Sequence, residues 1–376
     1  MGKGANSREV SAHTEAGRAG DPWSGFDGHE RVLVSRDPVS GVRMVVALHS
    51  TVLGPALGGT RMASYADAPD PGAAAYADAL RLSRAMTYKN SLAGLDHGGG
   101  KGVILADPAA KDPEVLHAYG RLVASLDGAY VTAGDVGMAV TDMDVIAETC
   151  RWTTGRSPEK GGVGDSGILT ALGVFRGLQA SARVVFGSDD LDGRRIAVIG
   201  AGKVGGRLIG HLAEAGAAVV ATDPSPAARD AVLDRFTQVR FVDSLDDLLA
   251  EAPEILSPNA MGGLITEELA GVLPVRLVCG GANNQLAGPS AGVLLAERGV
   301  VYAPDFMVNC GGVIQVAEEL VGGDLDRARQ RTERVYETTL RVLERAASEA
   351  ITPVAAAERE AEDRIRLSRG VTHPSR

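Results

Sequence analysis

The chain of 376 residues contains little of what several protein classes require. Its three cysteines, Cys150, Cys279 and Cys310, are widely spaced and form no CxxC pair. A disulfide framework or a zinc site is therefore not expected, and a reducing cytoplasm fits the composition. No window holds eighteen consecutive apolar residues, so we expect no membrane span.

The chain also lacks an excess of positive charge. Its formal net charge is −10, and no basic stripe runs along it. This balance argues against nucleic acid or an anionic membrane as the main partner. Residues 1–24 begin with Gly, Ser, Ala and charged residues and lack the apolar core of a signal peptide, so we expect a flexible tail on a cytoplasmic protein.

Lysine is scarce. Only six of the 38 basic residues are lysines, and the rest are arginines. The lysines are Lys3, Lys89, Lys101, Lys111, Lys160 and Lys203. A lysine in an apolar, glycine-rich setting is therefore a candidate for chemistry, because a lysine with a depressed pKa can lose its proton and an arginine cannot.

The length is sufficient for two domains. Residues 25–155 have the pattern of an α/β domain, which we expect to carry substrate binding and catalysis. Strands are expected at 31–35, 43–49, 102–105 and 130–133, and helices at 72–86 and 113–126. The turn residues at 37–41 predict a hairpin between the first two strands.

A glycine-rich stretch at 155–167 is the expected hinge, and strands then alternate with helices. The strands are expected at 195–199, 218–222, 239–242, 255–257, 277–279 and 300–302. Such alternation is typical of a parallel, doubly wound sheet, so residues 156–352 are the expected Rossmann-type domain. Two final helices are expected near 325–348 and 353–369, and the segment 353–376 is expected to complete the first domain.

A dinucleotide-binding motif opens the second domain. A strand ends in a GxGxxG segment made of Gly200, Ala201, Gly202, Lys203, Val204 and Gly205. A helix at 207–214, a second strand and then Asp223 follow, which is the context that makes the motif specific. The Asp223 carboxylate should accept hydrogen bonds from the adenosine ribose and repel a 2′-phosphate, so we expect NAD as cofactor.

Three polar segments follow apolar runs in the first domain. They are residues 86–90, 94–104 and 132–137. A polar group at such a place is expected on the wall of a cleft. If Lys89 and Lys101 lie close together, each lowers the pKa of the other, and burial lowers both further. A lysine with a depressed pKa serves as a general base or as a carboxylate anchor.

These segments resemble the Glu/Leu/Phe/Val dehydrogenase family over about residues 25–370. The similar stretches, all in the family's order, are GPALGGTR (54–61), TYKN (87–90), GGGK (98–101), GDVG (134–137), GANNQL (281–286), YAPDF (302–306) and NCGGVI (309–314). The resemblance implies a two-domain α/β enzyme that oxidises an amino acid to its 2-oxo acid and ammonia, and that forms a homo-oligomer.

The resemblance also implies roles for single residues. The backbone at Gly58 and Gly59 and the Lys89 ammonium would hold the substrate carboxylate. Lys101 would be the base that activates water, and Asp135 would exchange protons with the substrate nitrogen. The remaining implied contacts are Met86 and Asn284 with the substrate, and Thr170, Asn283 and Asn309 with the cofactor.

Leu57 bears on the substrate. Glutamate-specific members of the family carry a lysine at this place, whereas Leu57 would leave a glutamate carboxylate unpaired. The expected side-chain wall is apolar and consists of Leu57, Ala133, Val313 and Val316. We expect a branched-chain L-amino acid, with phenylalanine and, more distantly, tryptophan as alternatives. A non-catalytic NAD-binding protein is the alternative from another class. Met138, Asn259 and Cys310 depart from the usual family pattern.

Overall fold

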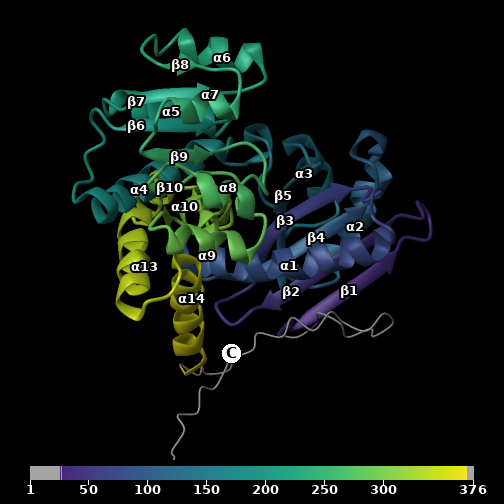
Figure 1. Cartoon of the computed structure of the whole chain (residues 1–376). Helices are drawn as coiled ribbons and strands as arrows, with labels where there is room; N and C mark the ends of the chain where they lie inside the picture. The colour runs from purple at the N-terminus through teal and green to yellow at the C-terminus, as the bar shows by residue number, and fades with distance from the viewer. Residues whose placement is uncertain (1–25, 27, 371–376) are drawn as a thin grey trace, which may run out of the picture.

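The structure is a computed structural model that describes residue 26 and residues 28–370. The predicted tail at 1–24 and the last six residues of the predicted C-terminal segment lie outside the described residues. Two sheets, each with helices around it, make up the two lobes that Figure 1 shows.

The first sheet has five strands in the order β1-β2-β4-β3-β5. Their bounds are β1 Arg31–Arg36, β2 Arg43–Ser50, β3 Ala56–Ala63, β4 Gly98–Leu105 and β5 Tyr130–Gly134. Strands β1, β2 and β4 pair antiparallel, whereas β3 pairs parallel with both β4 and β5. Helix α1 (Pro71–Leu92) covers one face, and α2 (Pro113–Ala124) and α3 (Val140–Ala147) cover the other.

The second sheet has six parallel strands in the order β11-β10-β9-β6-β7-β8. Their bounds are β6 Arg195–Ile199, β7 Ala218–Thr222, β8 Arg240–Phe241, β9 Ile255–Pro258, β10 Leu277–Val278 and β11 Val301–Tyr302. This is the strand order of the dinucleotide-binding Rossmann fold, read from the opposite edge. The predicted two-domain α/β fold class is thereby confirmed.

Helices link the strands of the second sheet and cover it. Their bounds are α4 Gly167–Phe186, α5 Gly205–Glu214, α6 Pro226–Leu233, α7 Leu245–Ala250, α8 Glu267–Val272, α9 Pro289–Glu297, α10 Asp305–Val308 and α11 Gly311–Glu319. Helix α4 is long and apolar enough to cross a membrane by length and composition alone, but 56% of its apolar window is buried inside the protein. It packs against α5, α11 and α13, so its apolar character belongs to the core.

The last three helices are α12 (Leu325–Glu333), α13 (Val335–Glu349) and α14 (Pro353–Gly370). The prediction of one helix at 325–348 is wrong, because the structure divides this segment into α12 and α13 at Arg334. Before α14, the Thr352 hydroxyl accepts a hydrogen bond from the Ala355 N–H at 3.3 Å, as an N-cap residue does.

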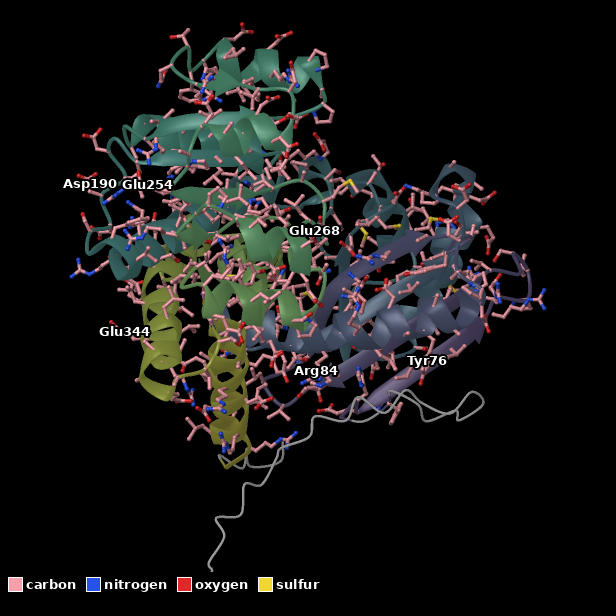
Figure 2. All side chains as sticks on the ribbon, viewed as in Figure 1. Tyr76, Arg84, Asp190, Glu254, Glu268 and Glu344 are labelled. Atoms are coloured by element: carbon pink, nitrogen blue, oxygen red, sulfur yellow. The ribbon has the colours of Figure 1, made fainter. Side chains whose placement is uncertain are left out.

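Helix α14 packs on both α1 and α13, and so joins the first lobe to the second (Figure 1). The Tyr88 hydroxyl on α1 donates to Glu362 at 2.9 Å, and the Ser91 hydroxyl donates to the Ala361 carbonyl at 3.1 Å. Arg84, which Figure 2 labels on α1, donates to the Tyr88 hydroxyl at 3.1 Å. The last described helix of the chain therefore packs against the first one.

Two strands differ from the predicted elements. Strand β3 covers residues for which no strand was predicted, and β4 begins at Gly98 instead of residue 102. Strand β4 is almost entirely buried and β3 is mostly so, which glycine permits when neighbouring backbones and rings approach closely. The three short strands β8, β10 and β11 are each two residues long, shorter than predicted.

Candidate active site

A cavity of about 340 Å³ lies between the two lobes. It brings together both residues predicted to be catalytic and every residue predicted to touch the substrate: Leu57, Gly58, Gly59, Met86, Lys89, Lys101, Ala133, Asp135, Asn284, Val313 and Val316. From the predicted cofactor set, Thr170, Val204, Asn283 and Asn309 line the same cavity. Their roles stay predictions, but their convergence from distant parts of the chain is a property of the fold.

The glycines of β4 explain how Lys101 reaches this cavity. A Cβ at Gly100 would lie 2.6 Å from the Tyr130 ring, and one at Gly102 would overlap the Tyr119 hydroxyl. Both rings pack in the core under α2 and α3. Because successive side chains of a strand point to opposite faces, Lys101 lies on the other face, toward α1 and the cavity. The glycines of β4 therefore leave room for two aromatic rings on the face under α2 and α3, while Lys101 lies on the opposite face, at the cavity.

Lys101 and Asp135 form a close pair. The Lys101 Nζ lies 2.5 Å from Asp135 Oδ2, and the lysine is only 5% exposed. Burial lowers the pKa of Lys101 from its usual value, while the charge of Asp135 acts against this shift. Burial acts to raise the pKa of Asp135, but the charge and hydrogen bond of Lys101 and the charge of Arg61 lower it to about 2. The carboxylate thus stays ionised at neutral pH.

Arg61 forms ion pairs with Asp135 and with a second carboxylate. Its Nε lies 3.4 Å from Asp135, and its Nη1 lies 2.7 Å from Asp78. The Tyr65 hydroxyl also donates to Asp78 at 2.7 Å. Arg61 therefore bridges two carboxylates, and its Nε approaches Oδ2 of Asp135, the same oxygen that Lys101 contacts.

Lys89 approaches the cavity from α1. Its Nζ donates to Asn283 Oδ1 at 3.2 Å, which connects the first lobe to the second. Burial lowers the pKa of Lys89, and the charge of Asp305 opposes this shift. Burial in turn raises the pKa of Asp305, against the effect of the Lys89 charge. A cation in this position can bind a carboxylate that enters the cavity.

Three asparagines form the opposite wall. Asn284 adopts a left-handed backbone conformation with φ of 53°, and its N–H donates to the Asp305 carboxylate. Asn309 Nδ2 donates to Asn283 Oδ1 at 2.8 Å, which orients the amide that contacts Lys89. The buried Asn309 Oδ1 has no hydrogen-bond partner among the residues that the structure describes. A ligand that offers an N–H would satisfy this acceptor.

The apolar side of the cavity is formed by the predicted wall. Leu57 is fully buried and packs in a cluster with Leu95, Val131 and Leu169. Ala133, Val313 and Val316 line the cavity beside it, and Met86 approaches from α1. The Thr170 hydroxyl, on α4, donates to the Ser166 carbonyl at 2.9 Å. Leu57 brings no charge to this wall.

The glycine-rich loop lies between β6 and α5. Gly200 has a φ of 92°, in the left-handed region, and a Cβ at Gly205 would overlap the Gly200 carbonyl. A Cβ at Gly202, in contrast, would meet no atom within 4 Å, and Lys203 beside it is exposed. Two glycines are thus required by the loop itself, whereas Gly202 borders open space.

Asp223 follows β7 next to this loop. Its Oδ2 accepts a hydrogen bond from the Ala201 N–H at 2.7 Å, and its Oδ1 accepts one from the Ser225 N–H at 2.8 Å. These bonds hold the carboxylate beside the glycine loop. An ionised carboxylate has further acceptor capacity for ribose hydroxyls.

Several cavity residues had no predicted role. They include Arg61, Asp305 and Phe306. Each lies within a quoted family motif, so the signal was present although no role followed from it. Met138 and Cys310 do not line the cavity but pack in or against the hydrophobic cores around it. Asn259 accepts from the Gly281 N–H at 2.8 Å and so ties β9 to the asparagine wall.

Comparison with known proteins places these features in a family. The model described as "Glu/Leu/Phe/Val dehydrogenase, dimerisation domain" matches residues 29–152, and that described as "Glutamate/Leucine/Phenylalanine/Valine dehydrogenase" matches residues 227–367. The valine dehydrogenase of Streptomyces coelicolor is 51% identical over 344 residues, which cover 91% of this chain and 93% of that protein. The leucine dehydrogenase of Geobacillus stearothermophilus is 42% identical over 347 residues, covering 92% and 93%.

Solved structures agree with this assignment. The L-tryptophan dehydrogenase of Nostoc punctiforme matches with a TM-score of 0.79 and 35% identity, covering 91% of this chain and 97% of that one. The hetero-hexameric glutamate dehydrogenase of Thermus thermophilus shares the fold, with a TM-score of 0.74 and 23% identity over 92% of this chain and 91% of that one. The resemblance found in the sequence is confirmed: the chain belongs to the Glu/Leu/Phe/Val dehydrogenase family of amino-acid dehydrogenases.

Proposed function

We propose that the chain catalyses the reversible, NAD-dependent oxidative deamination of a branched-chain L-amino acid to its 2-oxo acid and ammonia. The observation that carries the proposal is the Lys101–Asp135 pair, 2.5 Å apart, in one cavity with Lys89 and an uncharged wall. Such a cavity offers a cation for the substrate carboxylate, an acid–base pair for its nitrogen and carbon, and apolar surface for its side chain.

The chain's own residues would act as follows. The Lys89 ammonium binds the carboxylate and thereby orients the Cα–H bond. Asp135 takes a proton from the substrate ammonium and later returns one to the departing ammonia. Lys101, in its neutral form, takes a proton from the water that adds to the oxidised carbon. The protein thus contributes orientation and proton transfer, while bound NAD supplies the hydride acceptor.

The residues present fit a dinucleotide. The loop at Gly200–Gly205 opens α5, where N–H groups and the helix dipole favour a pyrophosphate, and Gly202 leaves space in front of it. The unpartnered Asn309 Oδ1 suits an amide N–H such as that of a nicotinamide carboxamide. Asp223, held beside the loop, suits ribose hydroxyls.

The substrate assignment rests on Leu57 and on the relatives named above. Those with 51% and 42% identity are a valine and a leucine dehydrogenase. We therefore rank branched aliphatic substrates first and phenylalanine second. We further propose a homo-oligomer, since the N-terminal match is to a domain described by dimerisation. The three cysteines, all free and buried, fit a reducing compartment, so we also propose a cytoplasmic location.

The direct test is NADH formation by the purified protein with a panel of L-amino acids at alkaline pH. Turnover with L-valine, L-leucine or L-isoleucine is the expected result. Tight NAD binding without turnover of any amino acid would instead support the non-catalytic alternative.

Cofactor choice gives a second measurement. We expect kcat/KM with NAD to exceed that with NADP by about 10²-fold or more, because like charges in contact cost several kcal/mol. The Asp223→Asn variant keeps the side-chain shape but removes the charge. It should therefore reduce the ratio of kcat/KM with NAD to kcat/KM with NADP. Equal values for the two cofactors with the unmodified protein would contradict the role of Asp223.

The glycine loop offers a matched pair of variants. Gly202→Ala should leave the unfolding free energy within about 1 kcal/mol, because its Cβ meets nothing, yet weaken NAD binding. Gly205→Ala should destabilise the fold by about 1–3 kcal/mol, because its Cβ overlaps the Gly200 carbonyl. Thermal unfolding and NAD titration of both variants check this; unchanged NAD affinity in Gly202→Ala would argue against a pyrophosphate at this loop.

A further inference from the structure

A cluster of hydroxyl groups lies beneath the glycines of β3, on the face opposite the cavity. Its members, all buried, are Thr60, Tyr119, Tyr130 and Thr132. The Thr60 hydroxyl donates to the Tyr119 hydroxyl at 2.7 Å and contacts that of Thr132. Of these four, Tyr130 is the member that reaches the backbone of the glycine pair: its hydroxyl donates to the Gly58 carbonyl at 2.9 Å and lies 3.5 Å from the Gly59 carbonyl.

The pairing of β3 with β4 is interrupted where this contact occurs. The register joins Ala56 and Leu57 to Gly98 and Gly99 and resumes at Thr60 with Gly102, so Gly58 and Gly59 have no partner on β4. On the other side, both glycines stay in register with β5. A Cβ at Gly58 would overlap the Gly100 carbonyl, which places the distortion in the glycine pair itself. The backbone groups of this pair that face β4 therefore take no part in a strand ladder and need other partners.

The direction of one N–H follows from peptide geometry. In a planar trans peptide the carbonyl of Gly58 and the N–H of Gly59 point in opposite directions. Tyr130 holds the carbonyl toward the core under α2 and α3. The Gly59 N–H then points away from that core, and Gly59 lines the cavity beside Lys101 and Asp135.

We propose that Tyr130 is a positioning residue for the substrate carboxylate: by holding the Gly58 carbonyl, its hydroxyl directs the Gly59 N–H into the cavity, where it and Lys89 bind that carboxylate from two sides. The inference rests on the proposed function. Tyr130 touches no substrate itself, since it lies on the other face of the sheet and acts through one peptide group.

The test compares Tyr130→Phe with Tyr119→Phe. Both variants remove one hydroxyl from the same buried cluster, but only the first removes the bond to the Gly58 carbonyl. We expect Tyr130→Phe to raise KM for L-valine about tenfold, which corresponds to about 1.4 kcal/mol, with kcat nearly unchanged. Tyr119→Phe should leave both parameters near their original values.

Two inhibitors separate carboxylate binding from a general effect on the pocket. Isovalerate keeps the carboxylate and side chain of valine without its amino group, and isobutylamine keeps the amino group and side chain without its carboxylate. Tyr130→Phe should weaken inhibition by isovalerate about tenfold and leave inhibition by isobutylamine unchanged. Equal weakening of both inhibitors, or equal KM changes in the two variants, would overturn the inference.

Failure of the inference is distinguishable from failure of the proposed function. If the unmodified protein oxidises no branched-chain amino acid, the proposed function is wrong whatever the variants do. If the unmodified protein is active and Tyr130→Phe, folded to the same melting temperature as Tyr119→Phe, keeps its KM, only the role of Tyr130 is wrong.

Discussion

Replacing Lys101 with alanine is expected to reduce kcat by about 10²–10⁴-fold or more while NAD binding persists. This is the range that the loss of a positioned acid–base group produces. The physical reason is the location of Lys101: it is buried, its pKa is lowered by that burial, and its ammonium lies 2.5 Å from Asp135. Steady-state kinetics and NAD titration check the two halves of the expectation, and near-normal turnover would exclude Lys101 as the base.

Lys111→Ala is the matched control. This lysine also pairs with an aspartate, its Nζ lying 2.6 Å from Asp142, but it does not line the cavity. Its loss should leave kcat unchanged. Lys101→Arg should be as inactive as Lys101→Ala, because arginine keeps its proton and cannot act as a base.

The same assignment fixes the sign of the pH dependence. A base must be deprotonated, so kcat/KM should fall as the pH decreases through the pKa of Lys101. That pKa lies below the usual lysine value of 10.5 because of burial. Asp135, with a pKa of about 2, stays ionised over the same pH range. Its titration therefore causes no further change in kcat/KM in that range.

Discrimination against glutamate is the second large effect that we expect. The branched-chain substrates should exceed L-glutamate in kcat/KM by about 10³-fold or more. A valine or leucine side chain gains about 1.5–3 kcal/mol when it is fully buried, whereas an unpaired buried carboxylate costs several kcal/mol. The uncharged Leu57 is the residue on which this balance depends. Kinetics with each amino acid measure the ratio.

Two variants sharpen the comparison. Leu57→Met keeps the size and apolar character of the side chain, so it should keep the preference for branched substrates. Leu57→Lys should lower that preference and raise relative activity on glutamate, because it supplies a cation. If the unmodified protein oxidised glutamate as fast as valine, Leu57 would not face the substrate side chain, whatever the stability of the variants.

The parallel sheet of the second lobe could be predicted because its pattern is local. Most of its strands are short apolar runs followed by a helix, and the GxGxxG segment marks the first crossover. Strand β3 could not be predicted in this way, since its burial comes from β4 and β5 on either side. The break at Arg334 gave no signal either, because neither glycine nor proline stands there.

The residues predicted to bind substrate or to be catalytic line one cavity, whereas the contacts that support them were not predicted. Lys101 and Asp135 are 34 positions apart, yet the resemblance placed both of them at the substrate. The bridge from Arg61 to Asp78 and the bond from Tyr130 to Gly58 depend on how strands and helices are stacked. Such contacts between elements leave no periodic trace in the sequence.

Helix α14 has a consequence for how the protein is made. It is the last described helix to leave the ribosome, and its partner α1 is among the first, with roughly 260 residues between them. At an elongation rate of about 5–20 residues per second, this interval lasts tens of seconds. Throughout it, the side of α1 that carries Tyr88 and Ser91 lacks its final cover. The first lobe therefore gains this cover only once α14 has been made, although its strands precede the second lobe in the chain.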